Sequence, residues 1–330
     1  MKKFINSVDQ VENEMATGFA KAYPQYLKKI DYGNVFVRTE KDPGKVAILC
    51  GSGSGHEPGH CGYVGKGMLD AFVAGPIFTS PTPDLIYEGI KAVQTDKGVL
   101  LMVMNYSGDI MNFEMAAEMA EADGIKVDKV IINDDVAVED QSLSDGRHGV
   151  AGSVLVNKIT GAKAESGASL EEVKAVAEKA IDNVRSMGAA ISPCTLPSMG
   201  KPGFEIAEDE IEIGIGVHGE PGTFTGKSMP VNDLVDIILD RILNDIDYNN
   251  SEVAVMINSA GATPLMELYI INDHVADVLA EKNIKVHRTF CGHYKTSIDM
   301  AGFSISLMKL DDELKKLLDA AADTPSLTIR

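Results

Sequence analysis

Apolar residues recur along the first half of the chain with two different spacings. Helical spacing predicts helices over 8–23, 113–122 and 170–187, the last opened by Ser169 as a possible N-cap. Short apolar runs of strand length lie at 45–49, 99–104 and 127–132. Polar residues follow each of these runs. This order of strand, polar loop and helix predicts a parallel or mixed sheet with helices on its faces.

The pattern is interrupted in the middle of the chain and then returns. Residues 189–204 hold three prolines and two glycines, which is typical of a crossing between domains. Beyond them the spacing predicts further strands and helices, with strands at 211–217, 253–257, 284–287 and 304–310, and helices at 234–243, 265–280 and 311–321. The predicted fold class is therefore α/β, with mixed or parallel sheets and helices on their faces. We expect two such domains, over residues 1–188 and 189–330.

Charge and hydropathy exclude several classes of function. The chain has 30 Lys and Arg against 49 Asp and Glu, a formal net charge of -19, so it would repel nucleic acid. No window approaches the roughly 18 uncharged apolar residues of a membrane span. The first residues lack the apolar segment of a signal peptide. We therefore expect a cytoplasmic protein that binds neither nucleic acid nor membrane.

The four cysteines give no sign of a disulfide framework or a zinc site. They are widely spaced and form no CxxC pair. Reduced, mostly buried thiols are the expected state for Cys50, Cys61, Cys194 and Cys291.

Three polar clusters follow predicted strands, where open α/β sheets bind ligands. The first is CGSGSGHEPGH at 50–60. Glycines there allow a close approach of backbone N–H groups to an anion or a carbonyl oxygen. The dinucleotide fingerprint GxGxxG does not fit, because His56 stands where its third glycine would be. A surface turn whose histidines cap a helix is the alternative.

The second cluster is NYSGD at 105–109, after the strand that ends at Met104. Asp109 at a strand end is a candidate general base, and the alternative is an N-cap for the following helix.

The third cluster, VHGEPG at 217–222, places His218 at the end of the predicted strand 211–217. This histidine can act as a general base, a metal ligand or a nucleophile, or it can be structural. The nearby GTFTGKS run is not a P-loop, because Pro221 stands where that motif needs glycine. His56, His60 and His218 are possible metal ligands. HEPGH is broken by a proline and a glycine, however, so its histidines do not share one helix face, and we expect no metal.

Runs across nearly the whole chain resemble a known family. They are GSGSGHEPGHCGYVGKGMLDAFVAGPIFTSPTPD (51–84), NYSGDIMNFEMAAE (105–118), VAVED (136–140), RHGVAGSVLVNKITGA (147–162), SPCTLPSMGKPGFEI (192–206), GIGVHGEPG (214–222) and SIDMAGFSISLMKLDDEL (297–314). In this order they resemble dihydroxyacetone kinase subunit K. GHEP, NYxGDxxNF and HGEPG are the most specific of these elements.

The resemblance implies roles for several residues. His218 would attack the ketone of dihydroxyacetone and hold it as a hemiaminal. Asp109 would take the proton of the hydroxyl that is phosphorylated, and His56 would hydrogen-bond the substrate. The other residues expected to line the pocket are Gly53, Ser54, Gly55, Met104 and Ser80. The resemblance also implies that the last helix packs back on the first domain.

The resemblance also implies partners. In this family the nucleotide sits on a separate module, the L subunit, and in bacterial three-subunit systems a phosphotransferase protein rephosphorylates ADP held there. We therefore expect no cofactor in this chain, with ADP or ATP and magnesium on the L subunit. The family further implies a homodimer.

Some positions depart from the family pattern. Ser52 replaces a glycine, Gly59 and Cys61 replace alanines, Met104 replaces a lysine, and Ala260 interrupts the usual NxLG run. The trio of His56, Asp109 and His218 is intact. The family also contains non-catalytic paralogues that bind dihydroxyacetone and act as transcriptional coactivators, which is the alternative function. A third possible function is a zinc hydrolase that uses His56 and His218.

Overall fold

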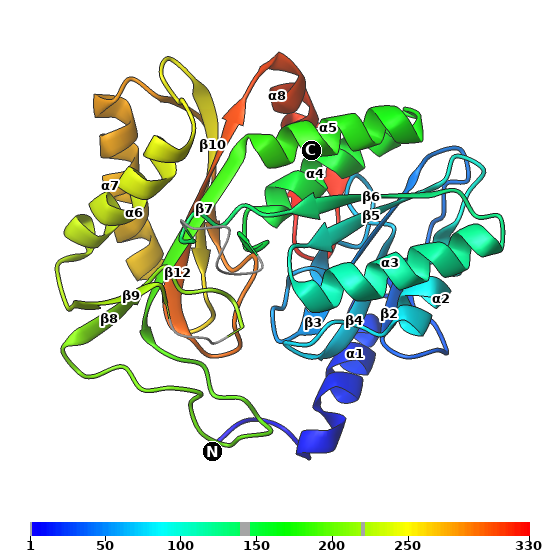
Figure 1. The fold of residues 1–330 in the computed structure, drawn as a ribbon, viewed down its shortest axis with the longest axis horizontal. Coiled ribbons are helices and arrows are strands. Elements are labelled where there is room, and N and C mark those ends of the chain that lie inside the picture. The colour runs from blue at the N-terminus through cyan, green and yellow to red at the C-terminus, as the bar shows by residue number, and fades with distance from the viewer. Residues whose placement is uncertain (1, 139–145, 219–221) are drawn as a thin grey trace. The chain divides into compact units, whose positions relative to one another are not determined.

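The computed structural model describes residues 2–138, 146–218 and 222–330 (Figure 1). It divides into two compact units built from interleaved segments. The N-terminal unit comprises Phe4–Ile132, Val154–Ile181 and Glu313–Arg330. The C-terminal unit comprises Asn133–Ser153 and Asp182–Asp312, with the chain's first residues up to Lys3. The predicted boundary between residues 188 and 189 falls inside a strand of the C-terminal unit, β7 (Val184–Ser192).

The N-terminal unit is built on a six-stranded sheet in the order β1-β2-β4-β3-β5-β6. Its strands are β1 (Leu27–Lys29), β2 (Val35–Arg38), β3 (Ala47–Ser54), β4 (Ala71–Ile77), β5 (Val99–Met104) and β6 (Val127–Ile132). β4, β3, β5 and β6 run parallel, whereas β1 and β2 are antiparallel to their neighbours. Every residue of β3 and β5 is buried, as expected for parallel strands covered on both faces.

Helices surround this sheet (Figure 1). They are α1 (Val11–Ala22), α2 (Pro83–Val93), α3 (Ser107–Ala122), α4 (Ser153–Glu165), α5 (Leu170–Asp182) and α8 (Asp312–Asp319), with short 3-10 turns at Val8–Gln10 and Cys61–Tyr63 and a small β-ribbon of β13 (Ala322–Asp323) and β14 (Thr328–Ile329). α2 and α3 bury Ile86, Ile90 and Phe113 against Leu49 and Leu101 of the sheet. This packing removes apolar area from water and supplies the main driving force for the unit.

The last helix belongs to the N-terminal unit, as the resemblance implied. Lys163 and Lys179 both form ion pairs with Glu313. The buried Lys158 ammonium donates to the carbonyl of Leu317 at 2.7 Å. α8 is thereby attached to α4 and α5.

The C-terminal unit has a second six-stranded sheet, in the order β11-β10-β12-β7-β8-β9. Besides β7, its strands are β8 (Glu210–Ile213), β9 (Phe224–Lys227), β10 (Glu252–Ser259), β11 (Lys285–Gly292) and β12 (Ala301–Leu310). Only the β10–β11 pair is parallel among the described residues. α6 (Val231–Asp245) and α7 (Leu265–Glu281) bury Val235, Ile238 and Ile271 against its core. The predicted α/β class with mixed sheets is confirmed.

Two predicted elements have different bounds in the structure. The predicted helix 170–187 stops at Asp182, and β7 follows, because residues 184–192 pair with β12 and β8. The same pairing places the start of the predicted crossing 189–204 in a strand. Ser169 does cap α5: the Glu172 N–H donates to its hydroxyl at 3.3 Å, and its own N–H donates to the Glu172 carboxylate at 2.8 Å.

The cysteines are free, and Cys50, Cys61 and Cys194 are buried, as predicted. Over the described ranges, no helix has the length and apolarity needed to cross a membrane.

Candidate functional site

The loops after β3 and β5 leave the N-terminal sheet in opposite directions. β3 continues to β4 on one side, and β5 continues to β6 on the other, although β3 and β5 are adjacent and parallel. Such a switch point opens a crevice at the carboxyl ends of the strands, where α/β sheets bind ligands. His56 follows β3 by two residues, and Asp109 lies in the first turn of α3, directly after β5.

The glycine run expected to be a loop is instead the second half of β3, which extends to Ser54. A side chain at Gly53 would lie 2.5 Å from the backbone nitrogen of Thr79, and one at Gly51 would lie 2.9 Å from the Phe113 ring. The Ser54 hydroxyl donates to the carbonyl of Gly75 on β4 at 2.7 Å. The glycines therefore let the segment after β4 pack closely over the end of β3.

His56 is completely buried, and its ring stacks on Phe78. The ring centroids are 5.0 Å apart and the planes meet at 22°. Phe78 has a φ of 55°, a region that non-glycine residues rarely occupy, and its N–H donates to the Ser54 carbonyl at 3.0 Å. The imidazole is thus held by an aromatic partner fixed to the end of β3. The alternative of a surface turn is wrong, because His56 and His60 are both fully buried. His60 does occupy the N-cap position of the 3-10 turn Cys61–Tyr63, but its side chain makes no capping hydrogen bond there.

The loop after His56 is ordered by further polar contacts. The Asn157 amide lies 3.1 Å from Nδ1 of His60. Because an amide NH₂ donates, Nδ1 accepts, and the ring proton is assigned to Nε2. The Glu57 carboxylate accepts the Gly55 N–H at 3.1 Å, and burial raises the pKa of this carboxyl. Burial also raises the pKa of the Cys61 thiol, and the charge of Glu57 adds to that effect.

Asp109 is 5% exposed and is the third residue of α3. The alternative in which it caps the helix is wrong, since Tyr106 occupies the N-cap position. The partial positive charge of the helix N-terminus stabilises a carboxylate there. Met104, the last residue of β5, is buried beneath the same edge of the sheet.

Residues 78–81 contact both His56, which follows β3, and the first turns of α3. Phe78 touches His56, and the half-buried Ser80 lies so close to α3 that a side chain at Gly108 would approach it to 3.6 Å. The Asn112 side chain of α3 donates to the carbonyl of Pro81 at 2.9 Å. Sequence reasoning missed Phe78 and Asn112. Both lie in runs that carry the family resemblance, but no spacing singles them out.

His218 belongs to the C-terminal unit and is half-buried. The predicted strand 211–217 ends early, at Ile213, because Gly214 has a φ of +72°. His218 therefore follows its strand by five residues rather than directly. Residues 219–221 of the HGEPG run lie outside the described residues. The structure thus brings His56, Asp109, Ser80, Met104 and the glycine run together in one unit, whereas His218 is in the other.

The segment before His218 lines a cavity of about 20 Å³ together with Lys295 and Asn258. Lys295 is 1% exposed, and its ammonium donates to the Gly149 carbonyl at 3.2 Å. Asn258 accepts the N–H groups of Tyr294 and Lys295 at 2.9 Å each. The buried Lys295 ammonium and the Asn258 side chain, which accepts two backbone N–H groups, therefore fix the structure around residues 215–217.

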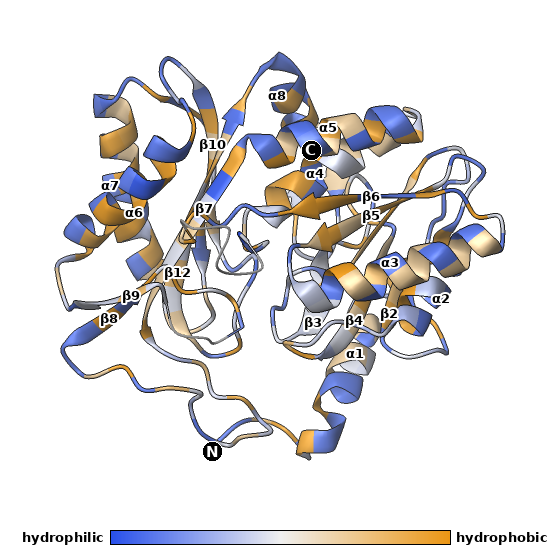
Figure 2. Ribbon diagram, viewed as in Figure 1, coloured by the Kyte–Doolittle hydropathy of each residue, from blue (hydrophilic) through white to orange (hydrophobic). Residues whose placement is uncertain are grey.

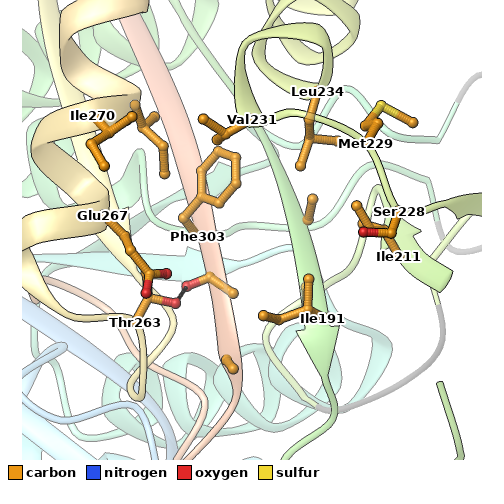
Figure 3. A pocket seen from close by; sticks show the side chains of 15 residues that line it. Ile191, Ile211, Ser228, Met229, Val231, Leu234, Thr263, Glu267, Ile270 and Phe303 are labelled. Atoms are coloured by element: carbon orange, nitrogen blue, oxygen red, sulfur yellow. Dashed lines mark hydrogen bonds between the residues drawn. The ribbon is translucent and has the colours of Figure 1, made fainter. Parts of the chain in front are cut away.

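The C-terminal unit also holds an apolar cavity of about 200 Å³ between its sheet and the helices α6 and α7 (Figure 3). Its polar side chains are Glu267, Ser228 and Thr263, and the Thr263 hydroxyl donates to the Gly302 carbonyl at 2.7 Å. The remaining lining is mostly aliphatic, including Ile191, Ile270 and Leu234. This lining suits an apolar group better than a small polyol. Across the part of the chain that the structure describes, no three His, Cys, Asp or Glu side chains converge as metal ligands would.

Comparisons with known proteins agree with the resemblance drawn from the motifs. The chain is 51% identical over 314 residues to the PTS-dependent dihydroxyacetone kinase 1, dihydroxyacetone-binding subunit DhaK, of Listeria innocua, with 95% of each chain covered. It is 42% identical to the corresponding subunit of the PEP-dependent dihydroxyacetone kinase of Escherichia coli, with 99% of each chain covered.

Two solved structures share the fold over almost the whole chain. The dihydroxyacetone kinase operon co-activator Dha-DhaQ has a TM-score of 0.92 at 31% identity, with 98% of this chain and 99% of that chain covered. The dihydroxyacetone kinase of C. freundii has a TM-score of 0.91 at 32% identity, with 99% of this chain and 60% of that chain covered. The model of the Dak1 domain matches residues 17–326. The chain is therefore a member of the Dak1 domain family.

Proposed function

We propose that this chain is the dihydroxyacetone-binding subunit of a dihydroxyacetone kinase, active only with a nucleotide-carrying partner. The observation that carries this proposal is the buried pair of His56 and Asp109 at the switch point of the N-terminal sheet. The 51% identity to a dihydroxyacetone-binding subunit supports it. A carboxylate base and a fixed imidazole at one edge of a sheet suit proton transfer from a small hydroxylated substrate.

In the proposed mechanism, His218 captures the substrate covalently. The lone pair of one imidazole nitrogen forms a bond to the ketone carbon, the carbonyl oxygen accepts a proton, and the other ring nitrogen gives one up. The product is a neutral hemiaminal. Glycerol has no carbonyl and cannot form it, so covalent capture selects the substrate by reaction type where contacts alone discriminate poorly.

Asp109 then acts on the terminal hydroxyl. It takes the hydroxyl proton as that oxygen attacks the terminal phosphorus of the donor, and the bond from phosphorus to the leaving nucleotide oxygen breaks. Covalent anchoring restricts the motion of the substrate, which is a proximity effect. His56, held by Phe78, hydrogen-bonds the bound substrate, and Gly53, Ser54, Gly55, Ser80 and Met104 line its surroundings.

The phosphoryl donor belongs to the partner in this proposal. ADP or ATP and magnesium would sit on an L-type subunit, because no run of this sequence reads as a nucleotide site. We further propose that the chain forms a homodimer, on the basis of its family resemblance.

A second function is favoured by one observation, the close structural match to the co-activator Dha-DhaQ. In that case the chain would bind dihydroxyacetone without turnover. The test is to mix the purified chain with its L-type subunit and a phosphoryl source and to assay dihydroxyacetone phosphate. The kinase subunit gives product only when both proteins are present. Capture of dihydroxyacetone without any product would identify a sensor instead.

A further inference from the structure

His218 lies in the connection between β8 and β9, two neighbouring antiparallel strands at one edge of the C-terminal sheet. The strand pairing ends at Ile213 and Phe224, so residues 214–223 form this connection. Hairpin connections are usually about 2–5 residues long, and their turn type then sets their shape. This connection is longer. The position of His218 therefore depends on the contacts that hold the two ends of the connection.

A buried carboxylate fastens the far end of this connection. Oε2 of Glu212 accepts the N–H of Gly222 at 2.8 Å, and Oε1 accepts the Thr225 hydroxyl at 2.6 Å. A side chain on Gly222 would lie 2.5 Å from the Ile213 carbonyl oxygen, so a glycine is needed for the backbone to return this close to β8. The Thr223 hydroxyl also donates to that carbonyl, at 3.2 Å. The far end is thereby bound to β8.

The near end of the connection is fixed to β7. Gly214 has a φ of +72° and donates its N–H to the Gly188 carbonyl at 2.8 Å. A side chain at Gly214 would clash with the Thr223 hydroxyl, so the two ends of the connection pack against each other. His218 is thus carried by a segment that is held by Gly188 at its near end and by Glu212 at its far end.

Glu212 faces away from the hydrophobic core of its unit. Glu and Ile alternate along β8, as the hydropathy colours do in Figure 2. Ile211 and Ile213 pack into the core, and side chains alternate across a strand, so Glu212 points to the opposite face, where it is 5% exposed. Burying a carboxylate is costly unless hydrogen bonds replace its water. Hydrogen bonds to a charged acceptor are roughly twice as strong as neutral ones, so a carboxylate holds Gly222 more firmly than an amide would.

We propose that Glu212 is a positioning residue for His218, because it fastens Gly222 to β8 and so fixes the segment that carries the imidazole. This inference rests on the proposed function. Attack on the ketone requires that the ring nitrogen approach the carbon to roughly 3–3.5 Å with its lone pair aligned. A connection released at Gly222 would adopt several conformations, and a fraction of them would present the ring in this way. The apparent affinity for dihydroxyacetone falls by that fraction.

The experiment measures the concentration of dihydroxyacetone that half-saturates covalent capture by the purified chain, read by intact mass after trapping. Glu212→Ala removes both hydrogen bonds and is expected to raise this concentration by at least about tenfold, the effect of losing a hydrogen bond to a charged group. Glu212→Gln keeps an acceptor for the Gly222 N–H, while its NH₂ group donates to the Thr225 hydroxyl. Its rise should stay below about threefold, since neutral hydrogen bonds replace charged ones.

Turnover with the L-type subunit gives a second readout. In Glu212→Ala the KM for dihydroxyacetone should rise in step with the half-saturating concentration for capture. The kcat at saturating dihydroxyacetone should change little, because phosphoryl transfer follows capture. A loss of folded protein alone would lower the maximal rate and leave KM unchanged, so the two parameters separate positioning from stability.

Thr263→Val is the matched control. Thr263 is 6% exposed in the same unit, and its hydroxyl donates to the Gly302 carbonyl at 2.7 Å. The substitution therefore removes a buried hydrogen bond that does not hold the connection between β8 and β9. We expect a lower free energy of unfolding and an unchanged half-saturating concentration for capture.

Should Glu212→Ala fail to fold, Gly222→Ala tests the same contact. Its added carbon would lie 2.5 Å from the Ile213 carbonyl oxygen and 3.1 Å from the Glu212 carboxylate, so the backbone must move away from β8. The same rise in the half-saturating concentration is expected.

Three outcomes overturn the proposal. One is an unchanged half-saturating concentration in Glu212→Ala or, in its place, Gly222→Ala. Another is an equal rise in Glu212→Gln, which would assign the effect to the charge rather than to the hold on Gly222. The third is an equal rise in Thr263→Val, which would show a general loosening of the unit.

Failure of the proposed function gives a different result. If the unmodified chain captures no dihydroxyacetone, the covalent mechanism fails, and the role of Glu212 fails with it. If the unmodified chain and Glu212→Ala capture dihydroxyacetone alike, covalent capture stands and the role of Glu212 does not.

Discussion

The His56 imidazole lies face to face with the Phe78 ring, 5.0 Å between centroids, inside the N-terminal unit. Phe78 holds this position with a backbone φ of 55° and a hydrogen bond to Ser54. The stacking fixes the plane of an imidazole that otherwise rotates about its own side-chain bonds. Phe78 is therefore a positioning residue for His56 in the proposed function.

Phe78→Ala should slow phosphoryl transfer with little effect on capture. An aromatic pair is worth about 0.5–1.5 kcal/mol beyond burial, which corresponds to a loss of up to about tenfold in kcat. Steady-state assays with the L-type subunit give this value. Phe78→Tyr keeps the ring and should restore most of the rate. Equal losses of kcat in Phe78→Ala and Phe78→Tyr would show that stacking on the aromatic ring does not position His56.

His218→Ala and Asp109→Asn should separate capture from turnover. His218→Ala loses the hemiaminal, since no other nucleophile replaces the imidazole, whereas Asp109→Asn keeps the hemiaminal and loses product formation. Intact-mass spectrometry after trapping reports capture, and the coupled assay reports turnover. Undiminished affinity for dihydroxyacetone in His218→Ala would falsify the covalent mechanism.

Asn157→Ala should destabilise the N-terminal unit without touching the proposed substrate. The substitution removes the donor to the buried Nδ1 of His60, and an unsatisfied buried acceptor costs about 1–3 kcal/mol. Urea denaturation followed by circular dichroism measures the free energy of unfolding. Asn112→Ala, which removes a donor to the Pro81 carbonyl at a half-buried site, is the comparison and should cost less. A smaller loss for Asn157→Ala than for Asn112→Ala would contradict the assigned donor.

Asp245→Asn should destabilise the C-terminal unit in a pH-dependent way. Burial opposes ionisation of Asp245, but hydrogen bonds and charge from Arg147 and Arg185 outweigh it, so the pKa of this carboxyl is lowered. A lowered pKa contributes stability above the unfolded value, near 3.9, and that stability is lost as pH falls through the folded value. We expect a loss of about 2 kcal/mol at pH 7, typical of hydrogen bonds to charged groups.

The control for this variant is the pH series itself. Chemical denaturation of both proteins from pH 7 down toward pH 3 should show their stabilities converging as Asp245 becomes protonated in the unmodified chain. A difference that stays constant over this range would mean that packing, rather than charge, accounts for the loss.

Much of the fold follows from the local pattern of the sequence. The strands at 99–104 and 127–132 lie where apolar runs predict them. For 99–104 the reason is that a strand buried on both faces needs an unbroken apolar stretch. Ser169 caps α5 as expected, and the structure adds Glu172 as its partner in a capping box, which depends only on residues three apart. The candidate chemistry of His56, Asp109 and His218 was also visible in the sequence, because polar residues after strands mark the ligand-binding edge of such sheets.

Other features depend on residues far apart in the chain. Residues 184–187 continue a helical pattern, yet they form β7, because their backbone groups pair with β12 more than 110 residues later. The run 51–54 contains two glycines and resembles a loop, yet it extends β3, because it pairs with the parallel strand β4. Gly53 also leaves room for the backbone of residues 78–79 to pack against it. Periodicity reports only the neighbours of a residue along the chain. Strand partners, the burial of His60 and the stacking of Phe78 on His56 are decided by contacts that form only when distant segments pack together.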